Sequence, residues 1–455
     1  MTTAARAAPW SAALRGRALR ILRTPLTWHL ASLVIGFGVV MLLQRSQWFF
    51  FDEWSFLQVK GPPMLEPHVG HWSTSPMALF HVLRDTVGMD SYLPFAFTET
   101  VAHVAVAHLI WRISLKGGAN PWIATAGVAV LVFLGSGAEN ILWAFQVGFL
   151  TGMALGLLAF LLASGPTLSR TRLVAIIAIS LFALTWSGTS LPLVVATAAL
   201  IAHRHGVRRA IVYAAACAAV YGTWYLRYAV GDQGNPGTGG FGLHKILVKV
   251  PEFLGVMLLL GWQSIFPVFG LGAIILIALL VWLIRLRKRR DLPGFSLPLI
   301  MTATAALFAF MTAYSRADWS TGAGKSSRYV YVLAALLLPL CAVGLTRLAR
   351  RRRVWIAGTC ALLVGLGAYQ TVLLTDAARE QAATEGGSDG VISAALFLYV
   401  HDPAGVDLTA HPDARWAPDV DLGDLVTMYS REALPIDPFT SADLAKERAI
   451  VMPAP

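Results

Sequence analysis

The sequence has 455 residues, of which 56% are hydrophobic and 13% charged, and its mean hydropathy is +0.63. Soluble domains carry roughly 25% charged residues, so this composition excludes a soluble enzyme, a disordered regulator and a nucleic-acid-binding domain. The net charge of +11 is unevenly distributed, because residues 375–455 contain 14 Asp and Glu against five Lys and Arg. The basic excess lies in short clusters between apolar runs, which indicates a polytopic membrane protein.

Eleven apolar runs are candidates to cross the ~30 Å of hydrocarbon in a bilayer as helices. In chain order they cover residues 26–43, 92–113, 121–134, 146–163, 173–186, 191–202, 210–226, 266–284, 295–314, 329–345 and 354–374. We interpret 173–202 as a hairpin of two helices, because both of its flanks are basic. The expected fold is an all-α polytopic membrane protein of about 11 transmembrane helices.

The connections between these runs alternate in charge. One set contains 22 Lys and Arg against a single acid, Asp291, and includes the clusters at 6–23, 285–290 and 347–353. Positive charge is retained on the cytoplasmic side of a membrane. We therefore expect the N-terminus inside, the C-terminus outside, and a multi-pass protein of the plasma (inner) membrane.

Three parts follow from this topology. They are a basic cytoplasmic N-terminus (1–25), a transmembrane domain (26–374) and an extracytoplasmic acidic tail (375–455), which the sequence leaves either folded as a lid or extended. The outer-face loops, which are longer or more polar than the inner ones, cover 45–91, 135–145, 228–265 and 315–328. Within the third, residues 232–240 have the composition of a flexible loop, and 243–260 suits a helix lying in the membrane interface.

Two adjacent acids, Asp52 and Glu53, follow the first predicted crossing within an aromatic stretch at 48–56. Apolar walls disfavour the charged form of a carboxyl group and raise its pKa, which suits a general base working near neutral pH. The alternative is an interfacial aromatic belt that carries two solvated acids.

The same loop contains His68 and His71, three residues apart and close to Glu66. This spacing suits a divalent metal if the segment is helical, but Pro67 and Gly70 disfavour a long helix there. His71 is alternatively a hydrogen-bond donor to a substrate hydroxyl or phosphate, or the histidines cap the helix that follows. No cofactor is required by the pattern, and a divalent metal is left open.

Glu99 and His103 lie one helical turn apart inside the second predicted crossing. Carboxylates inside a membrane are costly and usually face a cavity or a partner. We favour a buried Glu–His pair that holds two helices together over a proton relay.

The second outer loop places Glu139, Asn140 and Gln146 near a helix end, with Trp143 beside them. Amides and acids bind sugar hydroxyls, and an aromatic ring covers the apolar face of a sugar. This set therefore suits a sugar-binding lip, and a capped interfacial helix is the alternative.

The last outer loop is basic and leads directly into an apolar run. Lys325 and Arg328 stand beside the expected N-terminus of a helix, and Arg316 precedes them. Backbone N–H groups at a helix N-terminus, together with cationic side chains, form a phosphate site. A lipid-linked phosphate at the membrane surface is the expected ligand, and interfacial anchoring is the alternative.

Together these features resemble the GT-C superfamily of integral membrane glycosyltransferases. The resemblance covers the membrane part, about 26–374, and includes an inside N-terminus, one crossing and then acids in a long first outer loop. Local stretches at 51–54, 70–74, 139–146 and 326–329 also look like those of uncharacterised bacterial members. The resemblance implies transfer of a sugar from a polyprenyl-phosphate donor to an acceptor on the outer face, with a first-loop acid as base and a late-loop cation on the donor phosphate.

The hypothesis from the sequence is therefore an outward-facing glycosyltransferase whose acceptor is a glycan, lipid or protein of the cell envelope. Asp52 is the expected base, with Glu53 as its orienting partner or substitute. The expected substrate-binding residues are His68, His71, Trp72, Glu139, Asn140, Gln146, Arg316, Lys325 and Arg328. The rival hypothesis is a non-enzymatic transporter or assembly protein for lipid-linked envelope precursors, with Glu99 and His103 as proton-coupled groups.

Overall fold

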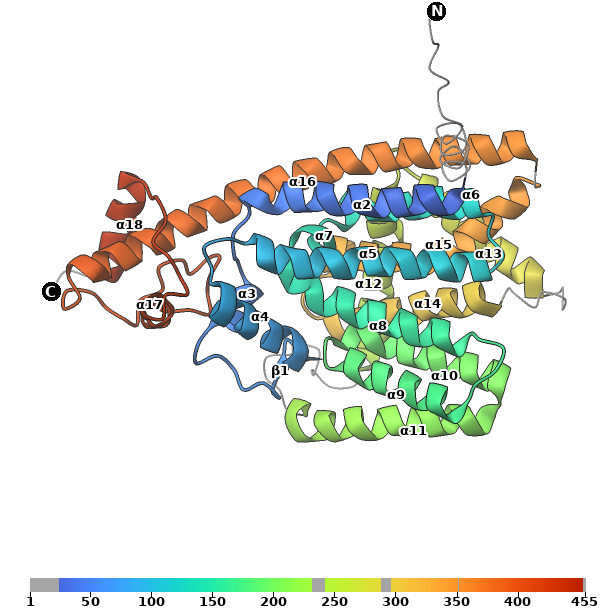
Figure 1. Ribbon diagram of the computed structural model, residues 1–455, viewed down its shortest axis with the longest axis horizontal. Coiled ribbons are helices and arrows are strands. Elements are labelled where there is room, and N and C mark those ends of the chain that lie inside the picture. The colour runs from blue at the N-terminus through green and yellow to red at the C-terminus, as the bar shows by residue number, and fades with distance from the viewer. Residues whose placement is uncertain (1–23, 231–241, 288–295, 351, 453–455) are drawn as a thin grey trace, which may run out of the picture.

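The protein is an almost entirely helical bundle in the computed structural model, which describes residues 24–230, 242–287, 296–350 and 352–452 (Figure 1). The predicted all-α polytopic membrane fold is confirmed. Most of the basic N-terminus (1–25), the whole loop 232–240 and the end of the cluster 285–290 lie outside the described residues.

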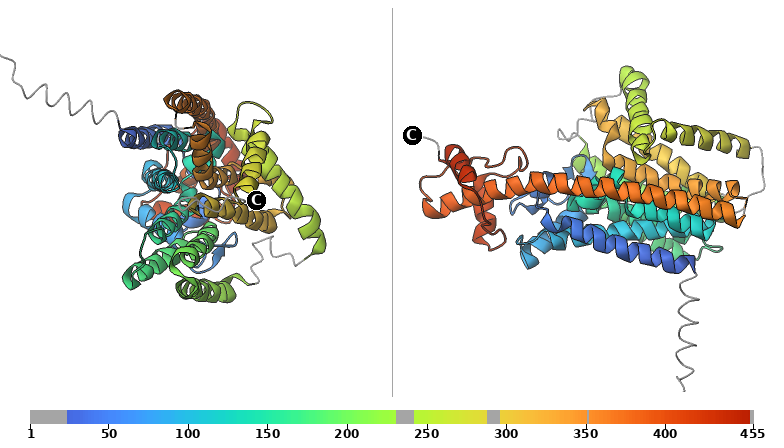
Figure 2. Two further views of the ribbon diagram at one scale, coloured as in Figure 1. Left: turned by 90° about the vertical axis from the view of Figure 1, so that its right-hand side faces the viewer. Right: turned by 90° about the horizontal axis from the view of Figure 1, so that it is seen from above.

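Each of the eleven predicted apolar runs falls on its own helix, and these helices lie side by side along the long axis of the molecule (Figures 1 and 2). In order they are α2 (Pro25–Leu43), α5 (Leu93–Lys116), α6 (Pro121–Val132), α8 (Val147–Ala163), α9 (Arg170–Leu184), α10 (Leu191–His205), α11 (Val207–Trp224), α13 (Leu271–Arg287), α14 (Ser296–Arg316), α15 (Ser327–Leu348) and the first half of α16 (Arg353–His401). The expected hairpin at 173–202 is the pair α9 and α10.

The number of membrane crossings stays a prediction. Seven helical segments within the described residues are long and apolar enough to cross a membrane. Helix α6 has only 12 residues, and at 1.5 Å per residue it rises about 18 Å, less than the ~30 Å of hydrocarbon. Helices α9 and α10 have 15 residues each.

Polar residues in the sequence define where several of these helices begin. The side chains of Thr24, Asn120 and Ser169 each accept a hydrogen bond from a backbone N–H in the first turn of α2, α6 and α9. Proline occupies the first turn of α2 and of α6, where its missing N–H costs nothing. The helix starts are therefore encoded locally.

One helical stretch runs across the bundle instead of along it (Figure 2). It comprises η7 (Lys245–Lys249), α12 (Val250–Val256), η8 (Met257–Gly261) and η9 (Trp262–Ile265). Lys245 Nζ and Lys249 Nζ each lie 2.7 Å from the Asp318 carboxylate, which follows α14. Length and composition alone would permit this stretch to cross a membrane, but its direction is that of the interfacial helix expected at 243–260.

Short elements lie between the long helices. They are η1 (Gln44–Ser46), α3 (Asp52–Leu57), β1 (Pro67–His68), β2 (His71–Trp72), α4 (Thr74–Val87), η2 (Gly135–Gly137), α7 (Glu139–Leu142), η3 (Ala144–Gln146), η4 (Gly188–Ser190), η5 (Tyr225–Ala229) and η10 (Thr321–Lys325). Elements α3, α4 and β1 lie at the end of the bundle opposite to the start of α2 (Figure 1).

The C-terminal part of the chain folds against the first outer loop. Helix α16 has 49 residues and is about 74 Å long, so its second half projects beyond the bundle, where α17 (Leu422–Ser430) and α18 (Ser441–Val451) pack on it (Figure 1). One buried apolar cluster joins Trp48 and Trp54 of the loop to Leu396 and Leu425 of the tail. The tail is therefore folded rather than extended.

Candidate functional site

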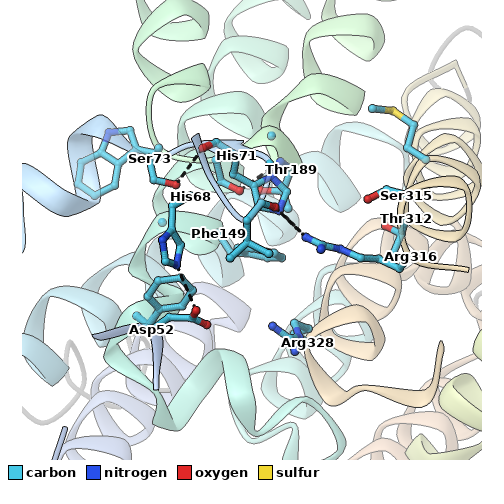
Figure 3. Close-up of a pocket in the computed structure, with 18 of the residues that line it drawn as sticks. Asp52, His68, His71, Ser73, Phe149, Thr189, Thr312, Ser315, Arg316 and Arg328 are labelled. Atoms are coloured by element: carbon cyan, nitrogen blue, oxygen red, sulfur yellow. Dashed lines mark hydrogen bonds and ion pairs between the residues drawn. The ribbon is translucent and has the colours of Figure 1, made fainter. Parts of the chain in front are cut away.

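A cavity of about 1000 Å³ lies between the loop at 45–91 and the ends of several long helices. One wall comes from α3 and the β1–β2 hairpin, and the opposite wall from the end of α14 and the start of α15 (Figure 3). Its polar lining residues include Asp52, His68, His71, Ser73, Glu139, Ser187, Thr189, Thr312, Ser315, Arg316, Arg328 and Gln381. Several residues singled out from the sequence therefore meet in one space.

The acidic wall consists of Asp52 and its partner His68. Asp52 is the first residue of α3 and its side chain is 29% exposed. His68 Nε2 lies 3.1 Å from Asp52 Oδ1, which orients the carboxylate toward the cavity. Phe56 and Phe145 pack against the ring of His68 and limit its movement.

The two histidines come together through a hairpin and not through a helix. Val69 and Gly70 both have positive φ, 49° and 78°, as a tight two-residue hairpin turn requires. His68 and His71 are directly opposite each other in the register, and opposite residues of an antiparallel pair point to the same face. The turn therefore directs both rings into the cavity.

His71 contacts the cationic wall. Its Nε2 lies 3.4 Å from Arg316 Nη2. Burial and the nearby Arg316 charge lower the pKa of His71 to about 3, so the ring is neutral near pH 7. A Cβ atom at Gly188 would lie 2.7 Å from His71 Nδ1, so the ring occupies this position only because residue 188 lacks a side chain.

The donor set at the two histidines does not match a usual metal site. His68 is hydrogen-bonded to Asp52, whereas His71 faces Arg316. The positive charge of Arg316 beside His71 opposes the binding of a metal ion there. Among the described residues, no group of three or more His, Cys, Asp or Glu side chains could hold a metal ion.

Arg316 and Arg328 form the cationic wall (Figure 3). Arg316 ends α14, is 7% exposed, and donates from Nη2 to the Val69 carbonyl at 3.1 Å. Its Nη1 is buried without a hydrogen-bond partner, and within the described part of the chain no carboxylate forms an ion pair with it. A buried guanidinium without a counter-ion is costly, which is a physical reason to expect an anionic ligand.

Glu139 has a different environment from the expected sugar-binding lip. Its Oε2 accepts hydrogen bonds from Ser326 Oγ, Ser327 Oγ and the Arg328 N–H at 2.7, 2.9 and 2.9 Å. Burial alone would raise the pKa of Glu139, but the Arg328 charge and these hydrogen bonds lower it. Glu139 therefore caps α15, and its carboxylate occupies the helix N-terminus where we expected a phosphate to bind.

Glu53 points away from the cavity although Asp52 precedes it. Its side chain is fully buried and accepts hydrogen bonds from the Phe50 N–H, the Tyr92 hydroxyl and the Phe145 N–H at 3.0, 2.8 and 3.1 Å. Burial raises the pKa of Glu53 well above its ordinary value. Glu53 thus joins the segments of Phe50, Tyr92 and Phe145 through hydrogen bonds to its carboxyl group. Because it is turned away from the cavity, its position does not suit a substitute base.

Four other predicted substrate contacts are not among the residues that line the cavity. Trp72 stacks on Trp224 with ring centroids 5.0 Å apart, and Lys325 is exposed elsewhere. Asn140 and Gln146 are fully buried, and their amide atoms have no hydrogen-bond partner among the described residues.

Glu99 and His103 are both buried, but they do not pair with each other as we favoured. Gln44 Nε2 and Thr100 Oγ1 each donate to Glu99 at 3.3 Å. His103 lies 2.8 Å from the Tyr331 hydroxyl. Neither residue lines the cavity, so each joins helices through partners of its own.

Trp186 and Thr189, which we did not predict as site residues from the sequence, line the cavity from the turn between α9 and α10. Trp186 Nε1 and Thr189 Oγ1 are buried and lack hydrogen-bond partners in the described residues. The polar Trp-Ser-Gly-Thr-Ser stretch between two apolar runs was the available signal. Gln381 of α16 was also missed, because nothing in the sequence places that helix beside the first loop.

Solved structures similar to this chain are those of the oligosaccharyltransferase of Archaeoglobus fulgidus. The structure tethered to an acceptor peptide with the NVT sequon matches 91% of this chain and 60% of its own, at 14% identity and a TM-score of 0.46. The complex with Zn and sulfate matches 90% and 58% at 14% identity, with a TM-score of 0.48. The complex of AglB with an inhibitory peptide and a dolichol-phosphate matches 91% and 60% at 14% identity, with a TM-score of 0.42.

This chain spans about 60% of the length of those proteins. Oligosaccharyltransferase AglB is a member of the GT-C superfamily, which the sequence resembles. No protein-family model and no curated protein matches the sequence. At 14% identity and TM-scores below 0.5, the similarity assigns no activity, so function rests on the cavity itself.

Proposed function

We propose that this protein is a membrane glycosyltransferase of the GT-C type, which transfers a sugar from a polyprenyl-phosphate donor to an acceptor at the outer face of the plasma (inner) membrane. The observation that carries this proposal is the cavity in which Asp52 faces Arg316 and Arg328 (Figure 3). Glycosyl transfer from a phosphate needs a base for the acceptor and cations for the departing phosphate.

In the proposed reaction, Asp52 accepts the proton of an acceptor hydroxyl or amide as that group attacks the anomeric carbon of the sugar. The new bond joins the acceptor atom to this carbon, and the bond from the carbon to the phosphate oxygen breaks. Arg316 and Arg328 neutralise the charge that develops on the phosphate. His68 holds the Asp52 carboxylate at 3.1 Å, and neutral His71 contacts the substrate.

The cavity has lining residues suited to both the sugar and the isoprenoid chain of a lipid-linked donor. Trp143, Trp186 and Thr189 line the cavity, and aromatic rings and a hydroxyl are groups that suit the apolar face and the hydroxyls of a sugar. Side chains of α10, α11 and α14, among them Leu191 and Phe310, form an apolar part of the lining. This part suits the isoprenoid chain of the donor.

The proposal is tested with membranes that contain the protein and labelled polyprenyl-phosphate sugars. Asp52→Asn keeps the shape of the side chain and removes the base, so we expect transfer to fall at least 10²-fold, an order-of-magnitude figure for a general base. Asp376→Asn is the matched control, because Asp376 is 62% exposed on α16 and does not line the cavity.

Full transfer by Asp52→Asn would refute the proposed base. The rival transporter hypothesis predicts the reverse pattern, in which Glu99→Gln abolishes function and Asp52→Asn leaves it intact. The acceptor, whether glycan, lipid or protein of the envelope, is identified by isolating the labelled product.

A further inference from the structure

The residue before the proposed base has a strained backbone. Phe51 has φ 51° and ψ −129°, a conformation that a bulky side chain rarely adopts. Such a conformation persists only where surrounding contacts hold it. Phe51 leads directly into Asp52 at the start of α3, so the direction of the Asp52 side chain depends on these contacts.

The contacts that hold Phe51 come from the C-terminal unit, which we define as residues 375–452. The Phe51 N–H donates to the Trp416 carbonyl at 2.6 Å, and the two rings pack edge to face with centroids 5.2 Å apart. Trp416 is in turn held in place, because its N–H donates to Asp413 Oδ1 at 3.1 Å and the Arg415 guanidinium lies 4.6 Å from its ring.

The C-terminal unit also forms hydrogen bonds with the chain before and after Phe51. Before it, the Trp48 N–H donates to Glu385 Oε2 at 2.9 Å, and Glu385 is fully buried. After it, the Ser55 hydroxyl donates to the Asp419 carboxylate, and the Gln58 amide donates to the Asp419 carbonyl. The segment that carries Asp52 is thus bound at its start, at the strained residue and at its end.

We propose that the C-terminal unit positions the base, with Trp416 and Glu385 as positioning residues that act through Asp52. This inference rests on the proposed function. If the Trp416 contacts are lost, Phe51 relaxes toward negative φ, and the Asp52 carboxylate leaves His68 and the cavity. A misplacement of about 1 Å costs on the order of 10²-fold in rate. Neither residue lines the cavity, so donor binding is expected to be unaffected.

The test compares Trp416→Ala, Trp416→Phe and Thr440→Ala in the full-length protein. Trp416→Ala removes the ring that packs on Phe51 and leaves the backbone carbonyl in place, so it should lower kcat by up to about 10²-fold with an unchanged KM for the donor. Trp416→Phe, which keeps an aromatic ring against Phe51, should recover most of kcat. Thr440→Ala removes the capping box at the start of α18, away from the first loop. It weakens the C-terminal unit without touching Phe51, so kcat should stay at the wild-type value.

Amide hydrogen exchange over residues 48–57 provides a readout that does not depend on activity. We expect faster exchange in Trp416→Ala, and wild-type exchange in Thr440→Ala and in Asp52→Asn. Wild-type exchange and kcat in Trp416→Ala would overturn the inference, and so would equal losses in Trp416→Ala and Thr440→Ala. An active Asp52→Asn together with faster exchange in Trp416→Ala would instead refute the proposed base while leaving the positioning contact in place.

Discussion

Replacing Arg316 with methionine should abolish most donor use without harming the fold. The guanidinium is buried at the cavity wall, and no carboxylate of the described chain forms an ion pair with it, so on the proposed function Arg316 binds the donor phosphate. A hydrogen bond to a charged group contributes ~1.5–3 kcal/mol, which corresponds to a roughly 10- to 150-fold loss in kcat/KM. Both partners of such a bond are held in a low-dielectric site, where its loss is felt most.

The thermal stability of Arg316→Met should equal or slightly exceed that of the wild type. Arg316 has no ion-pair partner among the residues that the structure describes, and exchange of an uncompensated buried charge for an apolar side chain is often neutral or stabilising. The assay is kcat/KM for a labelled polyprenyl-phosphate sugar, together with the thermal unfolding midpoint. Lys325→Met is the matched control, since Lys325 lies outside the cavity lining. Unchanged kcat/KM in Arg316→Met, or an equal loss in Lys325→Met, would refute the reasoning.

Three further predictions concern neighbours of the cavity. Gly188→Ala places a Cβ 2.7 Å from His71 Nδ1 and should lower transfer by displacing the ring; full activity with an unmoved His71 in a structure of the variant would contradict this. Thr189→Val removes a buried hydroxyl without partners in the described residues. It should lower kcat/KM about tenfold without loss of thermal stability. A gain in stability at the wild-type kcat/KM would show that the hydroxyl does not contact the substrate. Because burial raises the pKa of Glu53 above its value of 4.5 in the unfolded chain, Glu53 contributes stability that is greatest below pH 4.5 and decreases as the pH rises toward its folded pKa. Glu53→Gln should flatten this decrease in unfolding measurements at several pH values, and an unchanged pH profile would show that Glu53 does not titrate as inferred.

The long helices could be predicted because their signal is local. An apolar run of sufficient length specifies a buried or lipid-facing helix wherever its partners lie, and capping residues such as Thr24 and Asn120 act on the turn that follows them. The sequence predicted an interfacial helix at 243–260, although length and composition alone would also permit a crossing there. The packing of this stretch and its two lysines on Asp318 gave its cross-wise direction.

Within the candidate site, the adjacent acids Asp52 and Glu53 have different roles, and the sequence does not show which residue has which role. Successive residues of a helix point about 100° apart, so the start of α3 turns Asp52 to the cavity and Glu53 into the core. Which of the two faces the cavity depends on how α3 packs, and the Trp416 carbonyl that holds Phe51 comes from the far end of the chain.

The sequence by itself determined a membrane bundle, the loops that carry polar chemistry and most residues of the acidic and cationic walls, because hydropathy, turn residues and charge act over short stretches. Only the tertiary structure decided that Asp52 faces Arg316, that Glu139 caps α15, and that the acidic tail contacts the first loop. These relations join segments that are distant in the chain, and their geometry follows from packing, which no local pattern encodes.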